Sequence, residues 1–266
     1  KGNITGNVNG TASNTGTLTT SGANQTITGN VGTIENLNIN SGTTTVSGNI
    51  NSQNTNINND STLVLDNSIV NSAIKTGTAG TGNLNLKGTT NNVTGDVGES
   101  AKRLNNIEAL ANSNTTFNDD IYSNNIKLNS NSTVNSKGDI TANVAGTTGT
   151  LTTSGANQTI TGNVGTIENL NINSGTTTVS GNINSQNTNI NNDSTLVLNN
   201  STVNSTIKTG TANTGNLNLN GTTNNVTGDV GESGKRLNNI EALANSKTTF
   251  NNDIYSNNIK LNSNST

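Results

Sequence analysis

The stretch "TITGNVGTIENLNIN" occupies residues 26–40 and returns unchanged at residues 159–173. The match is longer than this quotation, because residues 15–133 match residues 148–266 at a constant offset of 133 with eight differences. Upstream, "KGNITGNV" at Lys1 resembles "KGDITANV" at Lys137. We therefore interpret the chain as two copies of one repeat, residues 1–136 and 137–266, forming one continuous rod excerpted from a longer protein. Long repeats of this kind constrain the fold class before any local pattern does.

A shorter period lies inside the long one. Ile27, Gly29 and Val31 are two residues apart, so on a β-strand they would share one face. The same apolar-x-small-x-apolar pattern occurs twelve times, about 22 residues apart on average. A period of this length without a helical pattern predicts stacked coils that bury a continuous core. We expect an all-β fold, a right-handed parallel β-helix (β-solenoid) of about twelve coils of roughly 22 residues. A β-sandwich or a disordered tract is the alternative, and neither requires the period.

The composition agrees with a thin, repetitive core. Only 27% of the residues are hydrophobic and 2% are aromatic, which is too few for one large globular core. Charged residues are also scarce, at 10% with a net charge of −3, so the sequence does not have the usual signature of disorder. The absence of cysteine excludes a disulfide scaffold. The net charge argues against a nucleic-acid partner.

The residue types argue against catalysis. The chain has no His and no Cys, which removes the usual triads, thiol chemistry and most transition-metal sites. Asp119 and Asp120 form the only Asp–Asp pair, and on the expected register Asp119 points inward and Asp120 outward. Two carboxylates on opposite faces do not act on one reacting atom. We therefore predict no catalytic, metal or cofactor site, and a protein that is not an enzyme.

One segment is chemically distinct. "ESAKRLNNIEAL" at residues 99–110 gathers charges and returns as "ESGKRLNNIEAL" at residues 232–243. Relative to the other half of each repeat it is an insertion of about five residues, and insertions in solenoids become protruding loops that often bind partners. The candidate partner-binding residues are Lys102, Arg103, Lys235 and Arg236. The alternative is that each loop is only a solvated turn.

Two phrases carry a resemblance to a known family. "GNLNLKGTTNNVTGDVG" at residues 82–98 is followed by "LNNIEALANSNTTFNDDIYSNNIKLNSNSTV" at residues 104–134. This ordered sequence resembles the passenger repeats of rickettsial-type autotransporters, the surface cell antigen and outer membrane protein A/B class. The resemblance is strong over Gly82–Val134 and Gly215–Thr266 and weaker over the intervening halves.

The resemblance implies a bacterial virulence protein on the extracellular face of the outer membrane, in which the exported passenger precedes a C-terminal membrane barrel. Any membrane attachment would then lie outside this chain. A host-cell surface protein or glycan is the implied partner. We accordingly expect an extended adhesin or spacer in host-cell attachment. A purely structural or antigenic stalk without a ligand is the first alternative. A β-helical glycan-active enzyme is the second, and it is disfavoured because the sequence offers no unique cluster of acidic and basic residues for a cleft.

Overall fold

The computed structural model describes residues 2–266, and these contain strands, tight turns and bends but no helix. The predicted all-β class is confirmed. The chain divides into two compact units, Lys1–Ala142 and Asn143–Thr266. The division falls inside strand β17 (Ile140–Gly146), whereas the boundary of the sequence repeat, between residues 136 and 137, falls just before this strand begins. Each unit is described separately.

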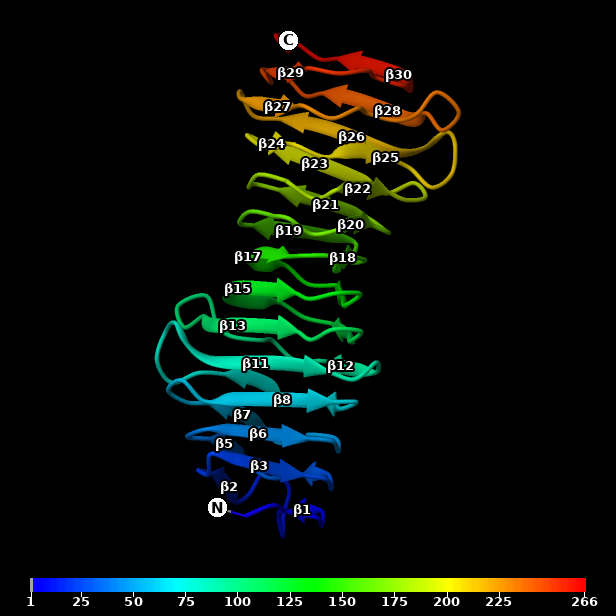
Figure 1. The fold of residues 1–266 in the computed structure, drawn as a ribbon. Coiled ribbons are helices and arrows are strands. Elements are labelled where there is room, and N and C mark those ends of the chain that lie inside the picture. The colour runs from blue at the N-terminus through cyan, green and yellow to red at the C-terminus, as the bar shows by residue number, and fades with distance from the viewer. Residues whose placement is uncertain (1) are drawn as a thin grey trace. The chain divides into compact units, whose positions relative to one another are not determined.

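The first unit is built from parallel strands that stack coil upon coil (Figure 1). Its longest sheet contains β3 (Asn24–Ile27), β6 (Thr43–Val46), β8 (Thr62–Asp66), β11 (Thr81–Lys87), β13 (Leu104–Ala109) and β15 (Ile121–Leu128). A second contains β2 (Thr17–Thr20), β5 (Asn36–Ile39), β7 (Asn54–Ile57) and β10 (Ala73–Lys75). The remaining strands are β1 (Val8–Asn9), β4 (Val31–Gly32), β9 (Ile69–Val70), β12 (Asn91–Val93), β14 (Asn114–Phe117) and β16 (Thr133–Ser136).

The second unit repeats this architecture. Its longest sheet contains β19 (Asn157–Thr161), β21 (Thr176–Val179), β23 (Thr195–Asn199), β26 (Thr214–Asn220), β28 (Leu237–Ala242) and β30 (Ser256–Leu261). A second contains β18 (Thr150–Thr153), β20 (Asn169–Ile172), β22 (Asn187–Ile190) and β25 (Thr206–Lys208), and a third contains β24 (Thr202–Val203), β27 (Asn224–Val226) and β29 (Thr248–Phe250).

Strands pair with their equivalents one coil away, which is the pairing of a parallel β-helix. Asn36 pairs with Asn54 on the next coil, and Asn91 pairs with Thr115 in the same way across a longer coil. The six strands of each longest sheet and β17 make about 13 coils, where the sequence pattern predicted twelve. The pattern gives too few coils because its occurrences fall at two different corners of the coil. One occurrence therefore does not correspond to one coil.

The core consists of columns of apolar side chains, in which equivalent inward-facing residues of successive coils lie on top of one another. In β5, β6 and β7 residues alternate between half-buried and buried, as expected for strands with one face inside. Leu63, Leu84 and Ile107 pair in register on successive coils, and each is fully buried. A coil therefore buries its apolar residues only against its neighbours.

The predicted shared face of Ile27, Gly29 and Val31 is wrong for the glycine. Strand β3 ends at Ile27 and β4 begins at Val31, so Gly29 lies in the corner between two sheets. A Cβ atom at Gly29 would lie 2.3 Å from the carbonyl oxygen of Gly6 on the preceding coil. The small residue is needed because consecutive backbones approach closely at this corner, and not because the core is narrow there.

Three structural roles account for the unusual asparagine content. Asn59 and Asn67 adopt positive φ angles of 53° and 60° in tight turns, a conformation that Asn tolerates better than most residues. At a corner, Asn30 Oδ1 accepts a hydrogen bond from the backbone N–H of Asn49, at 2.8 Å. On the sheets, Asn side chains stack, as where Asn56 Nδ2 donates to Asn38 Oδ1 at 2.8 Å.

Candidate functional site

The structure places the first predicted pair, Lys102 and Arg103, at a protruding tight turn. Glu99 and Lys102 close it through two backbone hydrogen bonds, of 3.1 and 2.9 Å. Lys102 is exposed and Arg103 is half-buried. The Glu99 carboxylate also lies 3.4 Å from the Lys75 ammonium group. The carboxylate of the turn is thus paired with a further basic side chain, Lys75.

The second predicted pair lies on the equivalent turn of the second unit. Glu232 and Lys235 exchange backbone hydrogen bonds of 3.1 and 3.0 Å, and Lys235 and Arg236 are both exposed. The insertion therefore forms a protruding turn in each unit, as the sequence predicts. Arg103 of the first turn also lines an open hollow of about 320 Å³, so the structure shows accessible charge at these residues and, beside the first turn, a shallow open site.

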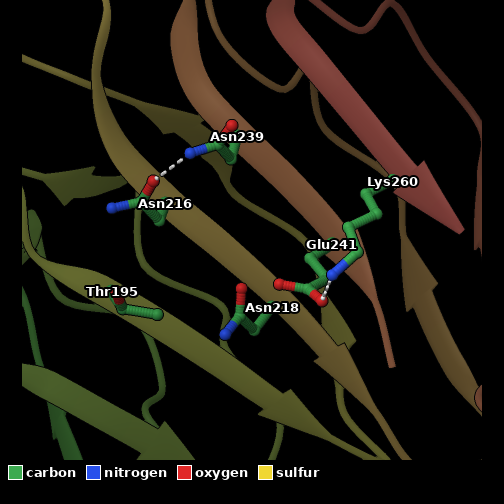
Figure 2. Close-up of a pocket in the computed structure, with 6 residues that line it drawn as sticks. All are labelled: Thr195, Asn216, Asn218, Asn239, Glu241 and Lys260. Carbon is green, nitrogen blue, oxygen red and sulfur yellow. Dashed lines mark hydrogen bonds and ion pairs between the residues drawn. The ribbon is translucent and has the colours of Figure 1, made fainter. Parts of the chain in front are cut away.

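A polar hollow lies elsewhere on the second unit, and sequence reasoning missed it. Figure 2 shows side chains that surround it, and its volume is about 410 Å³. The lining residues come from β23, β26, β28 and β30, and they are Thr195, Asn216, Asn218, Asn239, Glu241 and Lys260. All six belong to the outward-facing positions of these strands, which alternate with the buried Leu196, Leu217 and Ile240.

One side of the hollow is a column of stacked amides. Asn239 Nδ2 donates to Asn216 Oδ1 at 2.9 Å, and Asn258 Nδ2 donates to Asn239 Oδ1 at 3.1 Å. Asn216 also donates to the backbone carbonyl oxygens of Asp193 and Ser194, at 3.3 and 3.4 Å. These bonds hold the column in place, so this side of the hollow is fixed by the fold.

The opposite side contains an ion pair. Lys260 Nζ lies 2.7 Å from Glu241 Oε1, and Asn262 Nδ2 donates to the same oxygen at 2.8 Å. The hydrogen bond from Lys260, followed by that from Asn262, lowers the pKa of Glu241 below its ordinary value. Glu241 is therefore ionised at neutral pH, and within residues 2–266 its second carboxylate oxygen, Oε2, has no hydrogen-bond partner.

Asn218 lies between these two sides. It pairs with Val197 on one neighbouring strand and with Glu241 on the other. Among the residues that the structure describes, its side-chain amide has no hydrogen-bond partner, unlike that of Asn216 two positions earlier. The hollow therefore contains an amide that is free to bind solvent or a ligand.

The first unit carries the same hollow, with a volume of about 330 Å³. It is lined by Thr62, Asn83, Asn85, Asn106, Glu108 and Lys127, which are the sequence-repeat equivalents of the six residues above. Lys127 Nζ lies 2.8 Å from Glu108 Oε1, and hydrogen bonds from Lys127 and then Asn129 lower the pKa of Glu108. Asn85 corresponds to Asn218, and in the described part of the chain its amide also lacks a partner. Each unit thus contains one complete copy of the polar hollow.

Coil-by-coil alignment of the sequence could have found this hollow. When the buried Leu84, Ile107 and Ile126 are placed in one column, the residues beside them fall into two outward columns. The phrases "NLNL", "NNIEA" and "NNIKL" then bring amides beside a Glu–Lys pair. This alignment requires the register in which neighbouring strands pair. The average spacing of the sequence pattern does not define that register.

The expected orientation of Asp119 is wrong. Asp119 is exposed and lies in a corner, whereas Asp120 is half-buried and accepts two hydrogen bonds. Asp120 Oδ1 accepts from the backbone N–H of Asp139 at 2.8 Å, and Asp120 Oδ2 accepts from the Tyr122 hydroxyl at 3.1 Å. Burial and then the bond to Asp120 raise the pKa of Tyr122. Asp120 therefore has a structural role in joining consecutive coils.

Within residues 2–266, no three His, Cys, Asp or Glu side chains are grouped so that they could hold a metal ion. The same residues include no helix long and apolar enough to cross a membrane. No family model, no curated protein and no solved structure matches the chain. The resemblance to autotransporter passengers therefore rests on the sequence phrases alone.

The ion pairs of the two hollows yield a pH-dependent prediction. Because the folded-state pKa values of Glu108 and Glu241 are lowered, their contribution to stability is present at neutral pH and is lost as the pH falls through the lowered values, below about pH 4. Lys127→Met should move the pKa of Glu108 back toward its ordinary value, measured by NMR of the carboxyl carbon. Lys87→Met is the control, because Lys87 pairs with Asp66 instead. An unchanged Glu108 pKa in Lys127→Met would contradict the structure.

Proposed function

We propose that the chain is the surface-exposed repeat region of a bacterial autotransporter passenger, where it acts as an extended adhesin or spacer in host-cell attachment. The observation that carries the proposal is the distribution of polar groups. Among the described residues, the buried side chains include Thr, Ser, Asn and Gln but no Asp, Glu, Lys or Arg. Catalytic sites usually contain buried or strongly perturbed ionisable groups. A fold that places all of its charged side chains on the surface is suited to contact with a partner or to holding other parts of a protein apart.

The repeated architecture supports the same proposal. Each unit presents the same outward columns of Asn and Thr, the same Glu–Lys pair and the same protruding turn. Because each coil contacts mainly its neighbours, a solenoid can be lengthened by duplicating coils without remaking its core. Duplication thereby multiplies surface, which is of use to an adhesin or a spacer. The resemblance of Gly82–Val134 and Gly215–Thr266 to passenger repeats indicates the cellular setting.

A cell-binding measurement tests this proposal. The purified, fluorescently labelled chain should bind cultured epithelial cells above the level of an unrelated β-helical protein of similar size and net charge. The variant Lys102→Glu, Arg103→Glu, Lys235→Glu, Arg236→Glu tests the protruding turns. If these turns contact an acidic partner, the variant should bind more weakly, and added salt should have the same effect on the parent. Binding no stronger than the control protein would contradict the adhesin and favour a stalk without a ligand.

A further inference from the structure

We propose that the polar hollow of each unit is a binding site for a neutral, extended β-linked oligosaccharide. The site comprises Asn85, Glu108 and Lys127 with their columns in the first unit, and Asn218, Glu241 and Lys260 with theirs in the second. This inference deepens the proposed adhesive function, on which it rests, by naming a class of ligand and a site distinct from the protruding turns.

The available hydrogen-bonding groups match sugar hydroxyls. The free amide of Asn218 offers two N–H donors and one carbonyl acceptor, and the unpartnered Oε2 of Glu241 offers a further acceptor. A hydroxyl group both donates and accepts, so adjacent hydroxyls of one sugar can satisfy an amide and a carboxylate together. Figure 2 shows Asn218 beside the Glu241–Lys260 pair, on the same face of the strands. The Glu241 side chain is already held by Lys260 and Asn262, which limits the entropy cost of ordering it on binding.

Charge argues for a neutral ligand. The only charged lining residues, Glu241 and Lys260, neutralise each other at 2.7 Å, and Glu108 and Lys127 do so at 2.8 Å. Beside the first hollow, Asp66 and Lys87 form another ion pair, of 2.9 Å. In the second unit both of these residues are replaced, by Asn199 and Asn220, which pair in the same register. The residues around the hollow are therefore neutral overall in both units, so an acidic glycan would gain no net electrostatic attraction to the site.

Geometry argues for an extended chain. The outward columns repeat on successive parallel strands, which are about 4.8 Å apart. A ligand that runs along the column of Asn218 meets Val197, Asn218, Glu241 and Lys260 on successive strands, and a linear β-linked chain can follow such a row. The half-buried Val197, which pairs with Asn218, adds methyl groups for the C–H face of a sugar. A protein partner is disfavoured because the lining lacks the Trp, Tyr or Arg residues that usually anchor protein interfaces.

Saturation-transfer NMR with the full chain tests the site, with cellohexaose and chitohexaose as probes. We expect weak binding, with a Kd of about 1 mM, because no aromatic side chain stacks on the sugar. Binding should be unchanged in 0.5 M NaCl, a condition chosen to screen charge. The double variant Asn85→Ala, Asn218→Ala should weaken binding about tenfold. Its thermal unfolding should match that of the parent, because neither amide has a protein partner in the described chain.

The controls separate this site from the protruding turns. The four-residue charge-reversal variant of Lys102, Arg103, Lys235 and Arg236 should bind both probes as the parent does. Maltohexaose, which is neutral but coiled, and a heparin hexasaccharide, which is acidic, should bind at least about tenfold more weakly. The proposal is overturned if neither β-linked probe binds, if the double alanine variant binds them as well as the parent, or if maltohexaose or heparin binds equally well. Cell attachment without β-glycan binding would overturn this inference and leave the adhesin intact.

Discussion

Gly48→Leu should severely destabilise the coils around it. A Cβ atom at Gly48 would lie 2.3 Å from the carbonyl oxygen of Gly29 and 2.9 Å from the backbone nitrogen of Asn30. Both atoms belong to the backbone of the preceding coil, so relief requires the coils to separate. Overpacking in a core costs about 1–3 kcal/mol, and a backbone collision should cost at least the upper end of that range. Urea denaturation, followed by circular dichroism, measures the loss.

Gly6 provides the matched control for this substitution. It lies at the same corner, two coils before Gly48, but a Cβ atom there would have no neighbour within 4 Å. Gly6→Leu should therefore leave the urea midpoint within the range of ordinary surface substitutions, about 0.5 kcal/mol. If Gly6→Leu and Gly48→Leu destabilise the protein equally, close approach of the coils is not the reason for glycine at this corner.

Phe117→Ala should be the most costly truncation in the core. Phe117 is only 1% exposed and is the largest of the fully buried side chains. Truncation of a buried Phe to Ala typically costs about 3–5 kcal/mol, because both transfer energy and packing are lost. In a solenoid the damage should appear first in the adjacent coils, and hydrogen exchange of β12, β14 and β16 would show it.

The second copy supplies the comparison for Phe117. Phe250 is its equivalent but is only half-buried, so less apolar area is lost when it is truncated. Phe250→Ala should cost about half as much or less, by the same denaturation measurement. An equal loss from the two substitutions would show that burial does not explain the importance of Phe117.

The sequence was sufficient for the fold class because its signal is periodic. Apolar residues two apart, separated by Asn, Gly and Ser, predict strands that have one buried face, and Leu37, Leu63 and Leu84 are buried as that pattern requires. The corners were not predictable in the same way, because Gly29 and Asp119 continue an alternating pattern after the strand has already ended. Alternation alone does not show where a strand stops.

Of the candidate sites, the protruding turns could be predicted from the sequence and the polar hollow could not. An insertion relative to the rest of the repeat correctly placed Lys102 and Lys235 on protruding turns. The hollow was missed because it needs four strands in a defined register, and the length of a coil differs from one coil to the next. Glu108 and Lys127 are far apart in sequence, yet their charged atoms lie 2.8 Å apart. A contact of this kind becomes visible only when the pairing of each coil is known.

Methyl NOE spectroscopy tests most directly whether the coils stack in this register, on which both the hollow and the columns depend. Leu63, Leu84, Ile107 and Ile126 lie on β8, β11, β13 and β15, the strands that form the hollow of the first unit. The structure predicts cross-peaks between Leu63 and Leu84, between Leu84 and Ile107, and between Ile107 and Ile126. It predicts none between Leu63 and Ile126, which are three strand spacings apart, about 14 Å. Absence of the three neighbouring cross-peaks, or a strong one between Leu63 and Ile126, would contradict the stacked parallel β-helix.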